Sequence, residues 1–446
     1  MKNIFPNNQN LSPAKDFKSL NYLGSKMRIL DFLEENILRV TPERYGICDL
    51  FAGSGCVANR LANKRRVCAA DIQEYSRVIC SALLCPPIVS SDFVGSFLES
   101  VKIGLYKKLS LIYSPLIKIE NDAINNKDMA TLSSIIDNGS LEVFLKYHKC
   151  DDVITSALHE VSANIINTTL PSVDMLISKY YGGVYFSYEQ AIQIDAILKR
   201  IQDLPLSCKD LFLAALISTV SEIVNTVGKH FAQPLKPHDN KGVLKNFTKK
   251  IEKDRTMDVF EIYSLWLQKY ISVPLRNDKN IVYKSDYFTC LNNLPNEIRT
   301  VYADPPYTRD HYSRYYHLLE TIALRDTPSI STTNIGGVEQ YSRGIYREDR
   351  FQSPFCIKKE APIEFERMFK FCSDTERTLI LSYSPYDETK KTHPRVVTMT
   401  FLEELANKYF RNVQVISAGR FNHSKLNSIE HHLDASDMAE SIFVCY

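Results

Sequence analysis

Cysteine pairs with the spacing of a zinc ligand set are missing from this chain, although it contains 11 cysteines. The thiols stand singly and mostly beside apolar residues, as small core side chains do in a reducing compartment. We therefore expect neither a zinc site nor a disulfide framework. A long apolar run is missing as well, because neither the opening residues MKNIFPNNQN nor the stretch LFLAALISTV from Leu211 fits a signal peptide or a membrane span. The sequence predicts a cytoplasmic protein without membrane attachment.

An excess of one charge is also lacking. The chain has 54 Lys and Arg residues against 52 Asp and Glu residues, a formal net charge of +2. This balance excludes a polycation that coats nucleic acid over its whole surface, so any nucleic-acid contact must be local. Internal repeats and low-complexity tracts are absent. The 446 residues, 44% of them hydrophobic, suffice for one large domain with an insertion or second lobe.

The N-terminal part of the chain alternates between helical and strand-like patterns. Residues 31–38 have apolar side chains at helical spacing, and residues 46–51 form a short apolar run that ends in a glycine-rich turn. The pattern CVANRLANK after Gly55 predicts a helix, and residues 66–71 predict a second buried strand that ends in Asp71. This succession is typical of the start of a doubly wound α/β sheet.

A largely helical insertion interrupts this rhythm. Amphipathic segments such as VITSALHEVSANII, YEQAIQIDAILKRI and LFLAALISTVSEIV replace the strands, and strand-like runs return at 280–283, 300–303 and 379–383. We predict a discontinuous α/β domain of residues 18–90 and 276–446, with residues 91–275 as the insertion. The polar stretch 329–352 contains three glycines and predicts a surface loop.

A glycine-rich loop, Asp49-Leu50-Phe51-Ala52-Gly53-Ser54-Gly55, lies at the first strand-to-helix junction. Glycine lets a backbone turn sharply and a ligand approach closely, and the next helix offers its N–H groups. A plain tight turn and a phosphate loop remain alternatives, but the Gly-Lys-Ser/Thr of a Walker loop and the third glycine of a nicotinamide site are missing. Asp71, which ends the second strand, can accept both ribose hydroxyls of a nucleoside cofactor or cap the strand end.

The strongest chemical signal is Asp304-Pro305-Pro306-Tyr307, directly after the strand 300–303. An aromatic amine is a poor nucleophile because its lone pair is delocalised into the ring. The Asp304 carboxylate and the Pro305 carbonyl can accept its two N–H bonds and release the lone pair for attack on a sulfonium methyl. Pro305 and Pro306 stiffen the loop, and Tyr307 can stack on the base. The alternative is a proline-stiffened turn.

With these motifs the sequence resembles the Dam-type (alpha-group) DNA adenine-N6 methyltransferases, which use S-adenosyl-L-methionine (SAM). Tyr22-Leu23-Gly24-Ser25-Lys26 is similar to the family's YxGxK element, residues 51–55 to its FxGxG loop, and residues 304–307 to its DPPY motif. Asp286-Tyr287 stands where the family has an Asp-Phe pair, so Tyr287 is a conservative departure. The resemblance is specific for residues 20–75 and 280–320 and weak between them.

The resemblance implies a Rossmann-like class I methyltransferase fold with seven mostly parallel strands, and SAM as the cofactor. It implies that Tyr22 and Lys26 hold the methionine end of SAM, that Asp71 binds the ribose, and that Asp286 binds the adenine amine beside Tyr287. Asp49 and the loop residues Phe51, Ala52, Gly53 and Gly55 would line the cofactor. No metal is expected, because methyl transfer from a sulfonium needs none.

Methylation of a base inside a duplex requires that the base be flipped out of the stack, so we expect a DNA-binding surface. The basic and aromatic stretch after DPPY supplies Arg309, His311, Tyr312 and Arg314, although an ordinary helix packing its tyrosines would look similar. Within the insertion, a lysine-rich segment from Lys229 to Arg255 supplies Lys245 and Lys249 for phosphate contact. A solvated lysine face is the alternative there.

The predicted function is site-specific transfer of a methyl group to N6 of a flipped-out adenine in duplex DNA, with the insertion as the target-recognition domain. Cytosine N4 in DNA, adenine in RNA, a glutamine side chain and a catalytically silent DNA-binding relative remain open. The leading Asp of DPPY favours adenine. The partners would be duplex DNA and, in one of several biological settings, a restriction endonuclease.

Overall fold

The computed structural model describes residues 16–147, 152–276, 279–309, 311–384, 395–419 and 440–446. The opening residues MKNIFPNNQN, which bear on the prediction of no signal peptide, lie outside this part of the chain. In the described part, none of the helices combines the length and apolarity that crossing a bilayer requires.

Seven strands form the central sheet, in the order β3-β2-β1-β4-β7-β9-β8. Their bounds are Gly46–Asp49 (β1), Val67–Asp71 (β2), Ile281–Lys284 (β3), Ile298–Ala303 (β4), Thr378–Tyr383 (β7), Val413–Ser417 (β8) and Ser441–Cys445 (β9). All neighbouring pairs are parallel except those that β9 makes with β7 and β8. The predicted Rossmann-like, mostly parallel sheet is therefore confirmed.

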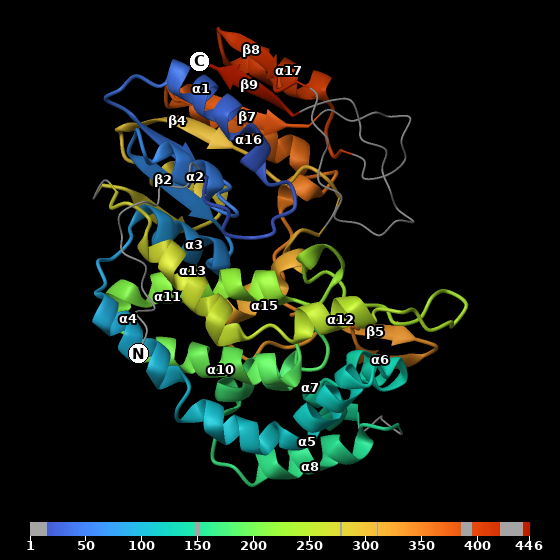
Figure 1. The fold of residues 1–446 in the computed structure, drawn as a ribbon. Coiled ribbons are helices and arrows are strands. Elements are labelled where there is room, and N and C mark those ends of the chain that lie inside the picture. Colours follow the sequence, from blue (N-terminus) through green and yellow to red (C-terminus); the bar gives the residue numbers. More distant parts are fainter. Residues whose placement is uncertain (1–15, 148–151, 277–278, 310, 385–394, 420–439) are drawn as a thin grey trace.

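Helices cover both faces of the sheet (Figure 1). One face packs against α1 (Leu30–Val40), α2 (Cys56–Leu61) and α3 (Glu74–Leu84), and the other against α14 (Tyr287–Asn292), α16 (Ala361–Asp374) and α17 (Met399–Tyr409). Alternate strand residues separate the two cores, because successive side chains of a strand point to opposite faces. Ile47 and Ala69 belong to the first core, and Cys48 and Cys68 to the second.

Helices dominate residues 91–271 as expected. They are α4 (Ser91–Val101), α5 (Leu105–Asn125), α6 (Met129–Asn138), α7 (Leu141–Tyr147), α8 (Thr155–Ile166), α9 (Leu176–Tyr180), α10 (Tyr188–Gln202), α11 (Leu206–Ile223), α12 (Thr248–Arg255) and α13 (Val259–Ile271). Short 3-10 helices occur at Lys26–Ile29 (η1), Ser172–Met175 (η2), Val227–Lys229 (η3) and Pro354–Cys356 (η4).

The inner insertion helices do not stand apart from the sheet domain. Leu216 and Val220 of α11 share one apolar core with Ile79 of α3 and with Leu319 of α15 (Ser313–Leu324). The outer helices α5, α7 and α8 form a second core around Leu109, which lies farther from the sheet (Figure 1). The insertion therefore has an inner layer continuous with the sheet domain and an outer layer of its own.

The stretch 329–352 is more ordered than the predicted surface loop. It contains an antiparallel hairpin of β5 (Thr332–Ile335) and β6 (Val338–Tyr341). Gly336 and Gly337 connect the strands with φ of 61° and 84°, the left-handed conformation that a two-residue hairpin turn requires. The sequence signal was present as a Gly-Gly pair between β-favouring Thr, Ile and Val residues.

Candidate active site

A cavity of about 360 Å³ lies at the carboxyl ends of the central parallel strands. Asp49 ends β1, Asp71 ends β2, and Asp304 follows β4 directly, so strand order alone brings these carboxylates to one edge of the sheet. The predicted residues that line the cavity are Tyr22, Lys26, Asp49, Phe51, Ala52, Gly53, Asp71, Asp286, Tyr287, Asp304, Pro305, Pro306, Tyr307 and Tyr312. Gly55 does not line it.

Gly53 and Gly55, the two glycines of the loop, have different structural roles. Gly53 adopts a φ of 52°, and a Cβ there would lie 2.7 Å from the Tyr22 hydroxyl, so glycine is needed for the close approach of that ring. Gly55 adopts a φ of 72° just before α2, and a Cβ there would lie 3.2 Å from Leu83 of α3. Gly53 thus shapes the cavity, whereas Gly55 starts α2 and lets it pack against α3.

Two carboxylates, one buried and one half-buried, accept backbone N–H groups around the loop. Oδ2 of Asp49 accepts the backbone N–H of Ala58 at 2.9 Å, and burial raises the pKa of Asp49 to about 7. Oδ2 of Asp71 accepts from the Gly53 N–H and Oδ1 accepts from the Gln73 N–H, both at 2.9 Å. Burial also raises the pKa of Asp71, and its two backbone hydrogen bonds oppose that effect. Asp71 therefore caps the strand end while its carboxylate lines the cavity.

Aromatic rings form the apolar part of the cavity. The ring centroids of Phe51 and Tyr287 lie 6.0 Å apart, and Phe355 meets them edge-on at 5.4 and 5.0 Å. Asp286 accepts the N–H groups of Phe288 and Thr289 at 3.0 Å and so caps α14. Phe355 was not predicted, because η4 has only three residues, follows the polar stretch and shows no periodic pattern.

The DPPY motif is held by an ion-pair network. Nζ of Lys26 lies 3.0 Å from Oδ1 of Asp304 and 3.0 Å from Oε1 of Glu440. Burial raises the pKa of Asp304 to about 6, and Lys26 opposes the rise. Lys26 thus contacts two protein carboxylates, those of Asp304 and Glu440. Glu440 was not among the residues predicted from the sequence.

Tyr307 is clamped from two sides. Its ring centroid lies 4.9 Å from that of Tyr383. The Arg395 guanidinium lies over the Tyr307 ring, 4.8 Å from the ring centroid. The Tyr307 carbonyl accepts the N–H of Val396 at 3.1 Å. These contacts connect the end of the motif to β7 and to the segment that contains Arg395 and Val396.

The stretch after DPPY divides between surface and core. Arg309 is exposed, His311 and Arg314 are half-buried, and Tyr312 lines the cavity. Burial lowers the pKa of His311, and nearby arginines add to the effect. Tyr316 of α15, in contrast, is buried, accepts the Leu23 N–H at 2.7 Å and stacks on the Tyr22 ring at 4.8 Å. The helix-packing interpretation therefore holds for Tyr316, and the DNA-binding role of the other residues stays a prediction.

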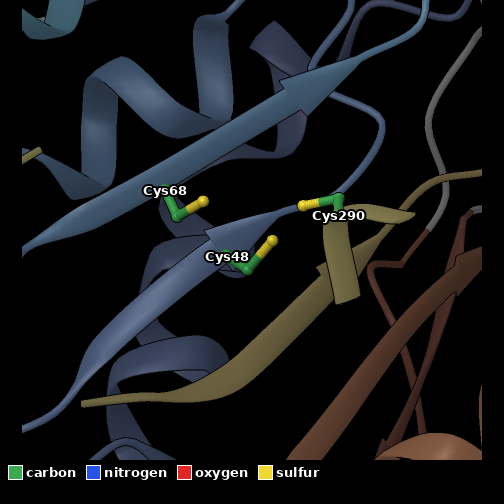
Figure 2. A group of neighbouring side chains, drawn as sticks. All are labelled: Cys48, Cys68 and Cys290. Carbon is green, nitrogen blue, oxygen red and sulfur yellow. The ribbon is translucent and has the colours of Figure 1, made fainter. Parts of the chain in front are cut away.

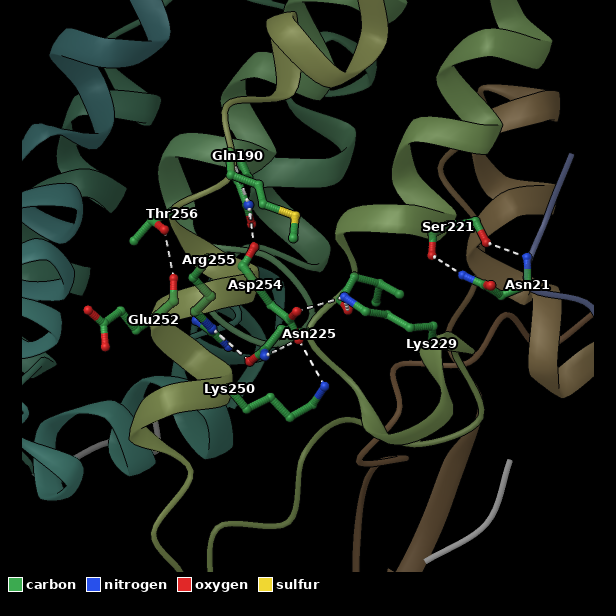
Figure 3. A network of polar contacts seen from close by, with 12 residues as sticks. Asn21, Gln190, Ser221, Asn225, Lys229, Lys250, Glu252, Asp254, Arg255 and Thr256 are labelled. Carbon is green, nitrogen blue, oxygen red and sulfur yellow. Dashed lines mark hydrogen bonds and ion pairs between the residues drawn. The ribbon is translucent and has the colours of Figure 1, made fainter. Parts of the chain in front are cut away.

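Several basic residues of the segment 229–255 stabilise the protein itself (Figure 3). Lys229 and Lys250 place their ammonium groups 2.8 and 2.9 Å from the buried carboxylate of Asp254. Arg255 pairs with Glu120 at 2.6 Å, with both side chains almost fully buried. Within the described ranges, Lys245 and Lys249 have no ion-pair partner, and Lys249 is exposed.

Three thiols meet in the core between the sheet and α14 (Figure 2). Cys48 of β1 pairs in register with Cys68 of β2, and Cys290 of α14 lies over both, with the three Sγ atoms within 4.8 Å of one another. Among the residues that the structure describes, no fourth His, Cys, Asp or Glu joins this group. A structural zinc site takes four ligands. The thiols belong to the apolar core between the sheet and α14.

Comparison with known proteins places these features in a family. Residues 22–138 and 239–357, more than half of the chain, match the D12 class N6 adenine-specific DNA methyltransferase family. The matched segments include the glycine-rich loop, Asp71 and the DPPY motif. The alternatives of cytosine N4, adenine in RNA and a glutamine side chain are thereby set aside in favour of adenine in DNA.

Curated relatives have the same type of activity in their names. The Type II methyltransferase M.CviAII of Paramecium bursaria Chlorella virus 1 is 22% identical over 372 residues, which cover 82% of this chain and 83% of the relative. M.NlaIII of Neisseria lactamica is 24% identical over 371 residues, 79% of this chain and 80% of the relative. M.FokI of Planomicrobium okeanokoites is 26% identical over 374 residues, 82% of this chain and 44% of the relative.

The sheet, the carboxylate-lined cavity at its carboxyl edge and the family match agree with one another. This chain belongs to the D12 class of N6 adenine-specific DNA methyltransferases.

Proposed function

We propose that this enzyme takes the methyl group from SAM and that the cavity at the carboxyl edge of the sheet holds both SAM and a flipped-out adenine. The observation that carries the proposal is that Asp71 and Asp304 open into one cavity of about 360 Å³. Binding sites for ligands of this size have volumes of roughly 300–1,000 Å³. The first carboxylate suits a ribose and the second an amine.

The residues present fit SAM along the length of the cavity. Phe51, Tyr287 and Phe355 offer apolar surface for the cofactor's adenine, with Asp286 beside them. Asp71 accepts the ribose hydroxyls, while Tyr22 and Asp49 line the methionine end. An ammonium has three N–H bonds, and Asp304 and Glu440 take two from Lys26, so the methionyl carboxylate can take the third.

SAM supplies an electrophilic methyl group on its sulfonium. The protein's part is to make the adenine amine nucleophilic. The Asp304 carboxylate and the Pro305 carbonyl accept the two N–H bonds of N6 and free its lone pair, and Tyr307 stacks on the adenine ring. As the new N–C bond forms, the bond between the methyl group and the sulfonium sulfur would break and leave a neutral thioether, and N6 would gain a positive charge and then lose a proton. Asp304, with a pKa of about 6, can accept that proton and pass it to solvent.

DNA binding is assigned to two groups of residues. Tyr312 lines the cavity and Arg309, His311 and Arg314 are its near neighbours in the chain; these side chains suit phosphates and the gap that a flipped base leaves. Lys245 and Lys249 suit phosphates farther along the duplex. We keep residues 91–275 as the target-recognition region, with the outer helices as its projecting part.

The relatives' names support a biological setting. Three are named Type II methyltransferases, and a further relative from Lactococcus lactis subsp. lactis, 24% identical over 406 residues, is named a modification methylase. We infer that this enzyme protects DNA from a restriction endonuclease that cuts at the same sequence.

Asp304→Asn separates chemistry from cofactor binding. The amide cannot take the N6 proton, so methyl transfer should fall by about 10²–10⁴-fold. SAM affinity, measured by calorimetry, should change by less than about tenfold, because Asp304 lies at the amine end of the cavity. Asp71→Asn should give the reverse pattern, with weaker SAM binding first. Loss of SAM binding in Asp304→Asn would mean that the two ends of the cavity are wrongly assigned.

A further inference from the structure

We propose that Glu440 is a positioning residue for methyl transfer: it holds the Lys26 ammonium against Asp304 and so fixes the direction of the carboxylate that accepts the N6 amine. The inference rests on the role proposed above for Asp304. Glu440 itself faces Lys26 rather than the reacting atoms.

The contacts form a continuous buried chain. Oε1 of Glu440 accepts a hydrogen bond from Ser382 Oγ at 2.9 Å and one from Lys26 Nζ at 3.0 Å. The same Nζ lies 3.0 Å from Oδ1 of Asp304. Glu440 and Lys26 are each 6% exposed, and Ser382 is fully buried. Water therefore has little access to the pair of Glu440 and Lys26, whereas Asp304 has 21% of its side chain exposed.

The antiparallel strand β9 explains how Glu440 reaches the site. β4 and β7 are parallel and end at the edge of the sheet that carries the cavity, while β9 starts there because it runs the opposite way. Glu440 directly precedes β9, and Ser382 pairs in register with Ile442. The Glu440 carbonyl also accepts the Ala418 N–H at 2.9 Å. Neighbouring strands thus fix the backbone at Glu440 on both sides.

A cation held between two carboxylates has a defined position only while both remain. Burial would lower the pKa of Lys26, but Asp304 and Glu440 raise it well above its usual value, so the ammonium stays charged. Without Glu440, the flexible lysine stem loses its second anchor and can follow the motion of the Asp304 carboxylate instead of restraining it. Misplacing an acceptor by a fraction of an ångström slows the chemical step more than it weakens substrate binding.

Opposite charges act on Asp304 from the two partners. Burial raises its pKa, Lys26 lowers it and Glu440 raises it. The other titratable groups that act on this cluster are Tyr22, Asp49, Cys56, Tyr302 and Tyr307. Lys26 and Glu440 also act on the pKa values of Tyr302 and Tyr307, but burial raises both pKa values above their usual range, so these phenols stay protonated. The two substitutions therefore act mainly on the charge of Asp304.

The test compares Glu440→Gln, Glu440→Ala and Lys26→Met with the unchanged enzyme in methyl transfer from SAM to duplex DNA. Glu440→Ala should lower kcat by about 10²-fold with KM for DNA changed by less than about threefold. Glu440→Gln keeps an oxygen for Lys26 and Ser382 and should recover part of that loss. Glu404→Gln, the same change at an exposed glutamate of α17, is the matched control and should retain full activity.

The pH dependence of kcat distinguishes positioning from general loss of structure. Removing the negative charge in Glu440→Gln should move the acid limb to lower pH, and removing the positive charge in Lys26→Met should move it to higher pH, each by on the order of one unit. Limbs that stay in place or move in the same direction would overturn the proposal. If Asp304→Asn kept full activity, the proposed role of Asp304 would fail instead, so the two failures are distinguishable. Circular dichroism and the thermal unfolding of each variant verify that it is folded.

Discussion

Burial leaves the Asp304 side chain with a pKa of about 6, which makes the charge of this group sensitive to pH in a range where the protein can be assayed. Asp49 is also buried and has a pKa of about 7. Its carboxylate accepts the backbone N–H of Ala58 and so holds the start of α2 in place. The same desolvation therefore affects a group that holds structure and a group to which the proposed mechanism gives a chemical role. Their pH effects can be separated, because in that mechanism only Asp304 contacts the amine.

The rate of methyl transfer should decrease when the pH is lowered below about 6, the pKa of Asp304. Asp304 must be ionised to accept the N6 proton, and the fraction ionised drops tenfold for each pH unit below its pKa. Single-turnover rates with saturating SAM, measured from pH 5 to 8, test this. A rate independent of pH over that range would contradict the role of Asp304 as proton acceptor.

Gly53→Ala should weaken SAM binding by about tenfold or more. The new Cβ would lie 2.7 Å from the Tyr22 hydroxyl, and the φ of 52° adds strain for any residue with a side chain. Gly95→Ala is the matched control, because a Cβ there meets nothing within 4 Å and lies in helix α4. That control should keep SAM affinity and gain about 0.5–1 kcal/mol of stability. Equal SAM affinity in both variants would show that Tyr22 is not confined by Gly53.

Most of the predicted catalytic and cofactor-binding residues line the cavity, because the motifs lie at strand ends and strand ends share an edge. Gly55 lay outside the cavity because it serves the packing of α2 against α3. Glu440 could not be predicted, since it is 414 residues from Lys26 and only the antiparallel direction of β9 brings the two together. Phe355 had no signal beyond its own aromatic side chain.

Elements were predictable where a periodic apolar pattern was long enough. Helices α8, α10 and α11 and strands β1, β2, β3, β4 and β7 lie where apolar periodicity and short apolar runs indicated them. The hairpin β5–β6 was missed because its strands have four residues each and lie in a polar stretch. Strands this short depend on their turn and on cross-strand pairs more than on hydrophobic alternation.

The buried pair that anchors α12 should contribute strongly to stability. Arg255→Met leaves Glu120 buried without its partner and should lower the free energy of unfolding by about 3–5 kcal/mol. Chemical denaturation measures the change, and the double variant Glu120→Leu/Arg255→Met should recover much of it. Arg200→Met, which breaks an exposed pair with Asp203, should cost less than about 1 kcal/mol. Similar losses for both pairs would contradict the importance of burial.

The loop and helix around Lys245 and Lys249 should affect DNA binding through charge. Each lysine that contacts a phosphate adds about 0.9 to the slope of log K against log salt concentration. The double variant Lys245→Ala/Lys249→Ala should therefore lower the slope by about 1.8. Lys107→Ala/Lys108→Ala, two exposed lysines of α5, is the control with the same loss of charge. An equal change of slope in both variants would remove Lys245 and Lys249 from the interface.

At the scale of the whole molecule, the insertion and the sheet domain share hydrogen bonds and an apolar core. Asn21, next to Tyr22, donates from its backbone and its side chain to Ser221 of α11, both at 3.2 Å (Figure 3). The apolar core of α11 and α13 also continues into α3 and α15. The division at residues 91 and 275 therefore remains a proposal about sequence organisation, and motion of the recognition region is expected in its outer helices rather than in α11.

The most direct test of the account is transfer of a labelled methyl group from SAM to mixed-sequence duplex DNA, followed by digestion to nucleosides. The account predicts that the label appears as N6-methyladenine and disappears in Asp304→Asn. Label in N4-methylcytosine, label in RNA but not in DNA, or no transfer by an enzyme that binds SAM would contradict it.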